Sequence, residues 1–381
     1  MIPYGKQFID QDDIDAVIAT LKSDYITQGA KIDEFEKKFA KKINAKYAIC
    51  VSNGTAALHI AAKAAGISSK TFAITTPMTF SATSNCILYN GGSTKFADIR
   101  KNGLINHHII RNLIDSDTKV IIPVDYAGFP CDLKEIQEIA KENDLIIIED
   151  ACHALGAKYG DSIIGDCKYS DMTIFSFHPV KHITTGEGGM ITTNSRELYE
   201  KLSTLRSHGI VKDPNILKKK DEGPWYYEMQ ELGYNYRLTD IQCALGISQL
   251  KKLDKFISRR REIAEIYNRE FANCPFFDII EEESHKKGAY HLYPILLKDK
   301  LIPKRREVFE KLREKQLWVQ VHYIPVYSLP YYQNLRYPQD QCPNADFFYS
   351  REISIPMYPS MTEADIDFVI KTIFSVFKSI I

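Results

Sequence analysis

Two side chains in this sequence, Asp150 and Lys181, are of types that take part in covalent or proton-transfer chemistry. Asp150 follows three isoleucines and a glutamate, and His153 comes shortly after it. Lys181 comes about thirty residues later, just before a glycine-rich stretch at 184–189. A buried amine near positive charge loses its proton more easily and can then form an imine with a carbonyl compound. The alternatives are a solvated surface charge for Lys181 and a helix cap for Asp150.

A run of small polar residues, Ser52-Asn53-Gly54-Thr55, lies between a predicted strand and a predicted helix. Small residues let the backbone approach a phosphate, and the free amides at a helix N-terminus bind its charge. No Gly-Lys-Ser/Thr follows, so the run is not a Walker loop. Many strand-to-helix turns have a similar composition, and the run alone does not identify a phosphate site.

Two further segments offer contacts for a ligand. Phe80 follows another predicted strand and presents an aromatic plane that suits a ring, although a phenylalanine alone at such a place is more often part of the core. Asn235 and Arg237 lie just before a predicted helix. An amide and a guanidinium at such a place suit an anion, a contact between subunits, or a loop contact without function.

Short β-rich runs alternate with helical patterns through the first two thirds of the chain. This alternation predicts an α/β fold with a mostly parallel sheet of seven strands and helices on both faces. Ligands of such sheets bind beyond the carboxyl ends of the strands, where Asp150 is expected. The predicted strands are 47–51, 72–75, 94–97, 119–124, 145–149, 173–175 and 190–193, and the helices between them are 56–65, 81–89, 133–142 and 196–206.

The two ends of the chain differ from this pattern. An amphipathic helix is predicted after Asp10 as N-cap, with Ile14, Val17, Ile18 and Leu21 on one face, and a second helix covers 31–42. After a long loop at 213–230, a helix at 239–251 leads into a basic helix that begins near Lys255. Strands near 293–297 and 318–321 and a final helix at 363–378 complete the prediction. We therefore expect a large domain at 1–254 and a smaller α+β domain at 255–381.

Composition excludes several classes of function. Lys+Arg and Asp+Glu both count 49, so no net charge favours nucleic acid or an anionic membrane. The apolar runs are shorter than a bilayer span, and the N-terminus lacks the pattern of a signal peptide. The eight cysteines occur singly, which is typical of reduced thiols in a cytoplasmic protein and does not indicate a zinc or other metal site.

Together, and in this order, the segments described above resemble the DegT/DnrJ-type sugar aminotransferases over nearly the whole chain. The resemblance implies the aspartate-aminotransferase-like fold (fold type I) and the cofactor pyridoxal 5'-phosphate (PLP). It implies that Lys181 holds PLP as a Schiff base and moves the proton, and that Asp150 keeps the pyridine nitrogen protonated. His153 and Phe80 would lie against the ring. Further cofactor contacts, to the phosphate, are implied for Gly54, Thr55, Ser176 and, from the neighbouring subunit of a homodimer, Asn235.

Four other runs are similar to the branch of this family that acts in pseudaminic acid biosynthesis: 177–181, 205–209, 291–295 and 321–323. That branch aminates C4 of a UDP-linked 4-keto-6-deoxy-N-acetyl-L-hexosamine, with L-glutamate as donor. The residues thereby implied in binding the nucleotide sugar are Tyr4, Asp24, Tyr25, Ile26, Thr27, His322, Tyr323 and Ile324. Asn53-Gly54-Thr55 and His182 depart from the pattern expected for that branch.

Three alternatives remain at the level of sequence. The chain could aminate a different nucleotide 4-keto-6-deoxy sugar. It could be a PLP-dependent sugar dehydratase, but members of that branch have histidine where this chain has Lys181. It could also be a non-catalytic regulatory or scaffold protein, which would not need the lysine, aspartate, serine and asparagine together.

Overall fold

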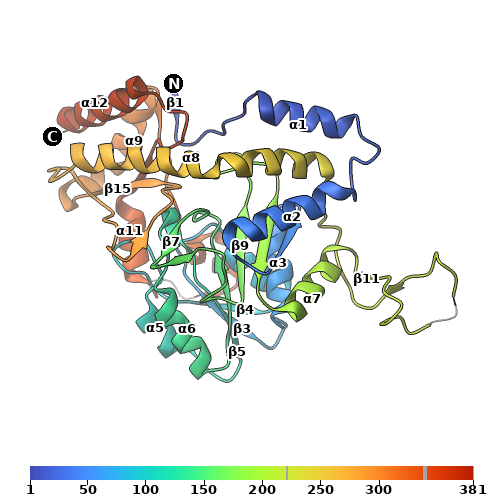
Figure 1. The fold of residues 1–381 in the computed structure, drawn as a ribbon. Coiled ribbons are helices and arrows are strands. Elements are labelled where there is room, and N and C mark those ends of the chain that lie inside the picture. The colour runs from blue at the N-terminus through green and yellow to red at the C-terminus, as the bar shows by residue number, and fades with distance from the viewer. Residues whose placement is uncertain (220–221, 338–340, 381) are drawn as a thin grey trace.

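A seven-stranded sheet forms the centre of the computed structural model, which describes residues 1–219, 222–337 and 341–380 (Figure 1). Strand β10 runs antiparallel to both of its neighbours, and all the other pairs that the register gives within the sheet are parallel. Each of the seven strands predicted for this sheet is found to within two residues at either end, which confirms the fold class. In spatial order the strands are β2 (Tyr47–Val51), β10 (Gly189–Thr193), β9 (Met172–Ser176), β6 (Ile146–Asp150), β5 (Thr118–Ile122), β3 (Phe72–Thr75) and β4 (Ser93–Phe96).

The sheet is buried on both faces because successive strand residues point to opposite sides. Ile147 belongs to a core shared with one set of helices, and Ile148 to a core shared with the other set. On the first side lie α2 (Ala30–Ile43), α5 (His107–Leu113), α6 (Leu133–Glu142) and α8 (Asp240–Glu270). On the second side lie α3 (Gly54–Ala64), α4 (Ala82–Tyr89) and α7 (Arg196–Arg206).

Helix α1 (Gln11–Leu21) begins with the predicted cap, because Asp10 and Asp13 form a capping box. Its predicted apolar face is not buried: Ile14 is 45% exposed and Ile18 is 41% exposed. Asp13 instead faces the protein, where Gln249 Nε2 donates to its carboxylate over 2.7 Å. Polar contacts with α8 therefore decide the orientation of this helix, and its apolar face is left at the surface of the chain.

Helix α8 is a single helix of 31 residues that begins at a Thr239 capping box. The prediction of one helix ending at 251 and another beginning near Lys255 was wrong, since charged residues continue the helix on its exposed side. The expected boundary between 254 and 255 falls inside α8, and the division of the chain into two domains there stays a prediction.

A second, antiparallel sheet lies in the C-terminal part of the chain, with β15 (Tyr293–Leu297) at its centre. The strand predicted at 318–321 is shorter than expected, because β16 (Leu317–Trp318) ends where the chain turns toward the large sheet and pairs with β1 (Ile2–Pro3). The predicted final helix is α12 (Glu363–Ile380). The other strands of this part are β13 (Phe277–Ile279) and β17 (Glu352–Ile355), and its other helices are α9 (Arg305–Glu314), α10 (Pro330–Asn334) and α11 (Pro343–Arg351).

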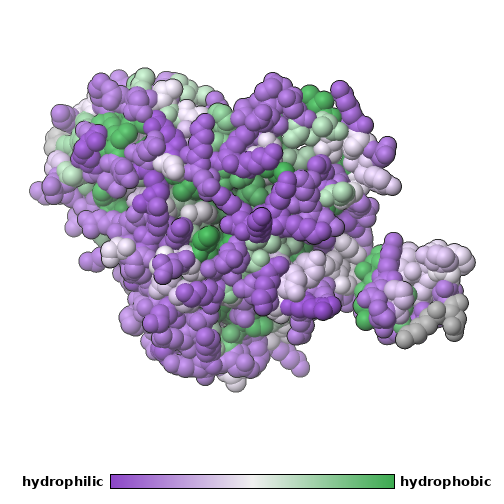
Figure 2. All heavy atoms as spheres, viewed as in Figure 1, coloured by the Kyte–Doolittle hydropathy of each residue, from purple (hydrophilic) through white to green (hydrophobic). Residues whose placement is uncertain are grey.

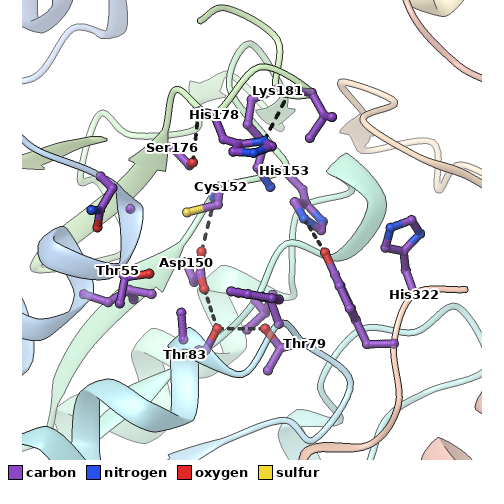
Figure 3. Close-up of a pocket in the computed structure, with 18 of the residues that line it drawn as sticks. Thr55, Thr79, Thr83, Asp150, Cys152, His153, Ser176, His178, Lys181 and His322 are labelled. Atoms are coloured by element: carbon purple, nitrogen blue, oxygen red, sulfur yellow. Dashed lines mark hydrogen bonds between the residues drawn. The ribbon is translucent and has the colours of Figure 1, made fainter. Parts of the chain in front are cut away.

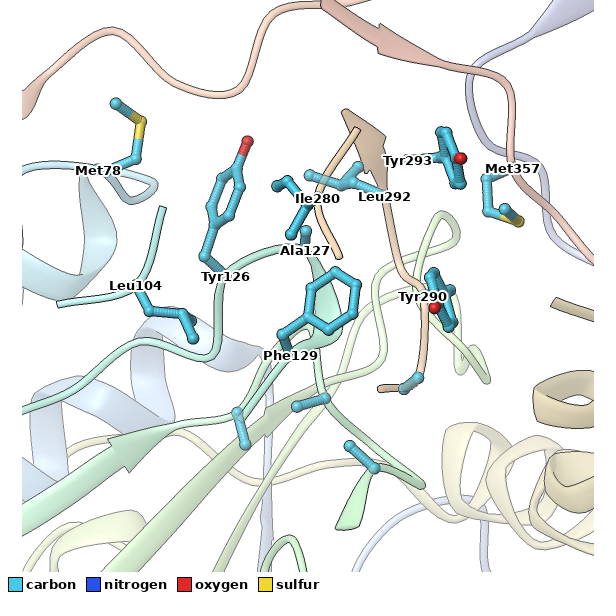
Figure 4. Packing of buried hydrophobic residues seen from close by; sticks show 14 of the residues in the cluster. Met78, Leu104, Tyr126, Ala127, Phe129, Ile280, Tyr290, Leu292, Tyr293 and Met357 are labelled. Atoms are coloured by element: carbon cyan, nitrogen blue, oxygen red, sulfur yellow. The ribbon is translucent and has the colours of Figure 1, made fainter. Parts of the chain in front are cut away.

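Aromatic and aliphatic side chains fill the space between the large sheet and this C-terminal part (Figure 4). Tyr126 and Phe129 come from a turn after β5, Tyr290 comes from the segment that leads into β15, and Tyr293 is the first residue of β15. The rings of Phe129 and Tyr290 pack edge to face, with their centroids 5.1 Å apart. A small sheet of β7 (Lys158–Tyr159), β8 (Ser162–Ile163) and β14 (Lys286–Lys287) links the same two regions.

An arm between α7 and α8 projects from the body of the molecule (Figures 1 and 2). The loop predicted at 213–230 forms most of it; residues 220–221 lie outside the described residues. Two short strands, β11 (Ile210–Val211) and β12 (Glu228–Met229), close its base. Across the described ranges, no helix has the length and apolar character needed to cross a bilayer.

Candidate active site

The carboxyl ends of β2, β3, β6 and β9 lie at one edge of the sheet, and side chains that follow them line a cavity of about 660 Å³ (Figure 3). The C-terminal part and the N-terminal segment supply the opposite wall. The predicted site residues that this cavity brings together are Tyr4, Gly54, Thr55, Phe80, Asp150, His153, Ser176, Lys181, His322 and Tyr323.

Asp150 is held at both carboxylate oxygens. The Thr83 hydroxyl donates to Oδ2 over 2.7 Å, and the Cys152 amide donates to Oδ1 over 3.2 Å. Because Thr83 has only one proton to give, its oxygen accepts from Thr79, which lies 2.7 Å away. A chain of two hydroxyls therefore fixes this buried carboxylate at the end of β6.

The N-terminus of α3 offers an anion site beside Ser176. Asn53 caps the helix, with its Oδ1 accepting from the Ala56 amide over 2.8 Å. The amides of Gly54 and Thr55 belong to the first turn and have no carbonyl one turn earlier to bond. A Cβ on Gly54 would lie 3.1 Å from the Ser176 Cβ, so glycine keeps this cradle open.

Lys181 lies in the tight turn that follows β9. Its amide donates to the His178 carbonyl over 2.9 Å, which folds the turn back toward the cavity. Burial lowers the pKa of the Lys181 amine, and the nearby Cys152 and Asp150 oppose that shift without cancelling it. A larger share of the amine is therefore neutral, as a nucleophile or a base requires.

His153 lies on the wall between Asp150 and the C-terminal part. Its Nε2 is 3.1 Å from the Tyr323 hydroxyl, and its ring centroid is 4.3 Å from that of His291. Burial lowers the pKa of His153 well below its usual value, with the positive charge of Lys181 adding to the effect. The imidazole is therefore neutral near pH 7.

The polar lining residues that were not predicted include Thr79, Thr83, His178, Glu187 and Gln320. The threonines are four residues apart at the start of a helix that follows a strand end, and this spacing could have indicated a shared face. Gln320 carried no such signal, since it comes from a distant segment of the chain.

Six predicted site residues lie away from the cavity. Asn235 is exposed, and its backbone pairs with that of Ser207 in an isolated β-bridge. Ile324 is 46% exposed and is not among the residues that line the cavity. The other four, in the exposed loop between α1 and α2, are Asp24, Tyr25, Ile26 and Thr27.

That loop is anchored elsewhere in the chain. Asp240, at the start of α8, accepts from the amides of Gly29 over 2.8 Å and of Lys31 over 2.9 Å. These bonds hold the loop on α8, which is why it does not reach the cavity of its own chain.

The chain is similar to known proteins over nearly its whole length. A transaminase from Campylobacter jejuni, named UDP-4-amino-4,6-dideoxy-N-acetyl-beta-L-altrosamine transaminase, is 42% identical over 385 residues, covering 100% of this chain and 98% of the relative. Helicobacter pylori PseC, described as an aminotransferase involved in the biosynthesis of pseudoaminic acid, has a TM-score of 0.92 at 33% identity, with 99% of each chain covered. Spr1654 from Streptococcus pneumoniae, described as a sugar aminotransferase and solved in a PLP form, has a TM-score of 0.92 at 26% identity, covering 100% of this chain and 99% of the other.

A family of proteins also matches this chain over almost its whole length. Residues 7–374 match the description of the DegT/DnrJ/EryC1/StrS aminotransferase family. This range includes Lys181, Asp150 and every strand of the large sheet. The chain belongs to the DegT/DnrJ/EryC1/StrS aminotransferase family.

Proposed function

We propose that this chain is a PLP-dependent aminotransferase that converts the C4 ketone of a UDP-linked 4-keto-6-deoxy-N-acetyl-L-hexosamine into an amine. L-glutamate is the amino donor, and the products are UDP-4-amino-4,6-dideoxy-N-acetyl-beta-L-altrosamine and 2-oxoglutarate. The observation that carries the proposal is a half-buried lysine of lowered pKa that shares one cavity with a fixed carboxylate and a helix N-terminus. The names of the Campylobacter and Helicobacter relatives support the choice of sugar.

The described residues fit PLP, which has an anionic phosphate, a basic ring nitrogen and an aldehyde. The open cradle at Gly54, with Ser176 beside it, suits the phosphate. Asp150 suits the ring nitrogen, because the bonds from Thr83 and Cys152 hold its carboxylate in place. When bound, PLP withdraws electrons from the carbon that carries the amino group, so that its proton can leave.

Lys181 has two tasks in this proposal. Its neutral amine would hold the cofactor covalently at rest, and the same amine would move a proton at the donor or sugar carbon during each half of the reaction. A positioned base of this kind contributes about 100- to 10,000-fold to the rate. His153 and Phe80 would flank the ring, and Tyr4, His322 and Tyr323 on the opposite wall would contact the sugar nucleotide.

Spectroscopy and product analysis test this function. The purified protein should be yellow, and L-glutamate alone should shift its absorbance as the amino group moves to the cofactor. A panel of nucleotide 4-keto sugars should then give one aminated product, identified by mass and NMR. An unchanged spectrum would contradict transamination, and amination of a different sugar only would contradict the proposed substrate.

We also propose a homodimer whose active sites lie at the subunit interface. Asn235 would reach the phosphate of the neighbouring subunit, and the loop at 24–27 would reach its sugar nucleotide. Exposed apolar side chains support a second copy as the partner: Ile14, Ile18 and Tyr25 near α1, and Trp225 and Leu232 on the arm are each at least 41% exposed.

The substrates and the eight free cysteines support a cytoplasmic location.

Mixing two variants tests the shared site. Lys181→Ala and Asn235→Ala should each have little activity alone. A mixed dimer has one site with both changes and one site with neither, so mixing after mild dissociation should restore up to about a quarter of the wild-type activity if subunits pair at random. No recovery, with exchange confirmed by mass spectrometry, would place Asn235 in the site of its own chain or in none.

A further inference from the structure

His322 is fixed at three of its four polar atoms by buried groups. Its amide donates to Glu352 Oε2 over 2.7 Å, and its carbonyl accepts from the Tyr126 hydroxyl over 2.6 Å. Its Nδ1 lies 2.9 Å from the Ser354 hydroxyl. Nε2 has no hydrogen-bond partner among the described residues, and the residue lines the cavity (Figure 3).

Ser354 links this imidazole to a second buried group. Its hydroxyl is also 2.5 Å from Glu352 Oε1, so it sits between a carboxyl group and an imidazole with one proton to share. Both Glu352 and Ser354 are fully buried, on strand β17. The hydrogen-bonded chain Glu352–Ser354–His322 therefore ends at the cavity.

The direction in which the hydrogen bonds of Glu352–Ser354–His322 run depends on whether Glu352 carries a proton. When Glu352 is ionised, Ser354 donates to it and must accept from His322 Nδ1–H, which leaves Nε2 without a proton. When Glu352 is protonated at Oε1, it donates to Ser354, Ser354 donates to Nδ1, and the single proton of the neutral imidazole is on Nε2. The first state presents an acceptor to the cavity, and the second presents a donor.

We propose that Glu352, acting through Ser354, is a positioning residue that sets the tautomer of His322 and so presents an Nε2–H donor to an oxygen atom of the nucleotide sugar. This inference rests on the proposed function, because it assigns a binding role to one wall of the same site. The ketone, hydroxyl and phosphate oxygens of such a substrate all accept hydrogen bonds. The donor tautomer is therefore the form that binds it.

The surroundings of Glu352 favour its protonated form. Burial raises the pKa of Glu352 to about 8, against the smaller opposing effects of Ser354, the His322 amide and the Arg305 guanidinium on α9. The other titratable groups that face it are the hydroxyls of Tyr126 and Tyr323, whose own pKa values are raised by burial.

His322 itself does not become charged near neutral pH. Burial lowers the pKa of His322 to about 3, with the positive charge of Lys181 adding to the effect. Deprotonation of Glu352 above pH 8 thus changes the tautomer of His322 and leaves its charge unchanged.

Binding of the UDP-linked 4-keto sugar tests the proposal directly. The PLP-loaded enzyme without an amino donor cannot aminate the ketone, so the dissociation constant can be measured by calorimetry between pH 6.5 and 9. For the wild type, the constant should rise about tenfold over this range as a donor is replaced by a bare nitrogen. Glu352→Gln keeps a donor to Ser354 at every pH. The dissociation constant of this variant for the sugar should therefore change much less between pH 6.5 and 9 than that of the wild type.

Two further variants complete this experiment. Glu314→Gln, at an exposed position on α9, is the matched control and should follow the wild type. Ser354→Ala removes the link between Glu352 and His322, so it should bind the UDP-linked 4-keto sugar less tightly at pH 7. Its dissociation constant should not show the further rise at high pH. This variant provides the test if Glu352→Gln fails to fold. An equal rise in wild type and Glu352→Gln, or a flat wild type, would overturn the proposal.

A readout without ligand separates this inference from the proposed function. In protein labelled with ¹⁵N-histidine, the ring signals lost in His322→Gln identify His322. They should show protonated Nε2 at pH 6.5 and protonated Nδ1 at pH 9 in the wild type, and protonated Nε2 at both values in Glu352→Gln. The same tautomer at both pH values in the wild type would refute the role of Glu352. A switching tautomer in a protein that does not bind the sugar would contradict only the proposed substrate.

Discussion

The Thr83 hydroxyl donates to Asp150 Oδ2 over 2.7 Å, and the two residues are 67 positions apart in the chain. Thr83 lies in the first turn of α4, and Asp150 is the last residue of β6. A helix that covers the large sheet and a strand of that sheet thus meet at one carboxylate. Its position depends on helix α4 as well as on its own strand.

Replacing Thr83 by valine should slow the reaction with L-glutamate. Valine has nearly the same shape but leaves Oδ2 without its donor, and a lost bond to a charged group is worth about 1.5–3 kcal/mol. We expect the rate of the absorbance change with glutamate to fall at least about tenfold. Thr83→Ser keeps the hydroxyl and should stay close to the wild type; equal loss in both variants would show that packing, not the hydrogen bond, matters.

Two substitutions at Asn53 should separate helix stability from cofactor binding. Asn53→Ala removes the cap of α3 and should cost about 1 kcal/mol of unfolding free energy. Asn53→Asp keeps a capping oxygen but places a negative charge beside the proposed phosphate site. Its stability without cofactor should match the wild type, while its PLP dissociation constant rises about tenfold or more. Unchanged PLP affinity in Asn53→Asp would argue against a phosphate at this helix end.

The buried carboxyl of Glu352 should make stability depend on pH. Its pKa is raised to about 8 in the folded chain, from 4.5, so the folded state binds more protons than the unfolded state between these values. The free energy of unfolding should therefore fall as the pH rises through this window, by up to a few kcal/mol. Denaturant unfolding of the apoprotein at pH 5 and 8.5 measures it. Glu352→Gln lacks this ionisation and should lose less stability; an equal loss would show that Glu352 is already ionised at pH 5.

Replacing Lys181 by alanine should abolish turnover without unfolding the chain. The variant loses both the amine that holds the cofactor and the base that moves the proton, so we expect a fall of at least about 100-fold in sugar amination. Lys37→Ala, at an exposed position on α2, is the matched control. Appreciable amine formation by Lys181→Ala, with circular dichroism like that of the wild type, would refute the assignment.

The sequence predicted the large sheet well because its strands are short apolar runs separated by helical patterns. Asp150 could be placed at a ligand site because ligands of such sheets bind beyond the carboxyl ends of the strands, whereas Ser176 and the phosphate role of Gly54 were implied by the resemblance to the family. The role of Thr83 could not be predicted, since its partner is distant in sequence. Nor could the Glu352–Ser354–His322 chain, which depends on how β17 packs beside the segment that follows β16.

The surface elements were harder to predict for a different reason. The apolar residues of α1 suggest a buried face, but the bond between Gln249 and Asp13 turns the polar side inward. Charged residues near Lys255 suggest a helix start, yet they lie along one continuous helix. In both places, local pattern and tertiary contact disagree, and the tertiary contact decides the structure.

The most direct test of the account is to find which side chain carries the cofactor. The PLP-loaded protein should be treated with borohydride, which makes the bond between the amine and the cofactor permanent, and its peptides should then be mapped by mass spectrometry. We predict that the added mass lies on Lys181 and is absent from the Lys181→Ala variant. A label on a different lysine, or no label in protein shown to bind PLP, would contradict the central claim.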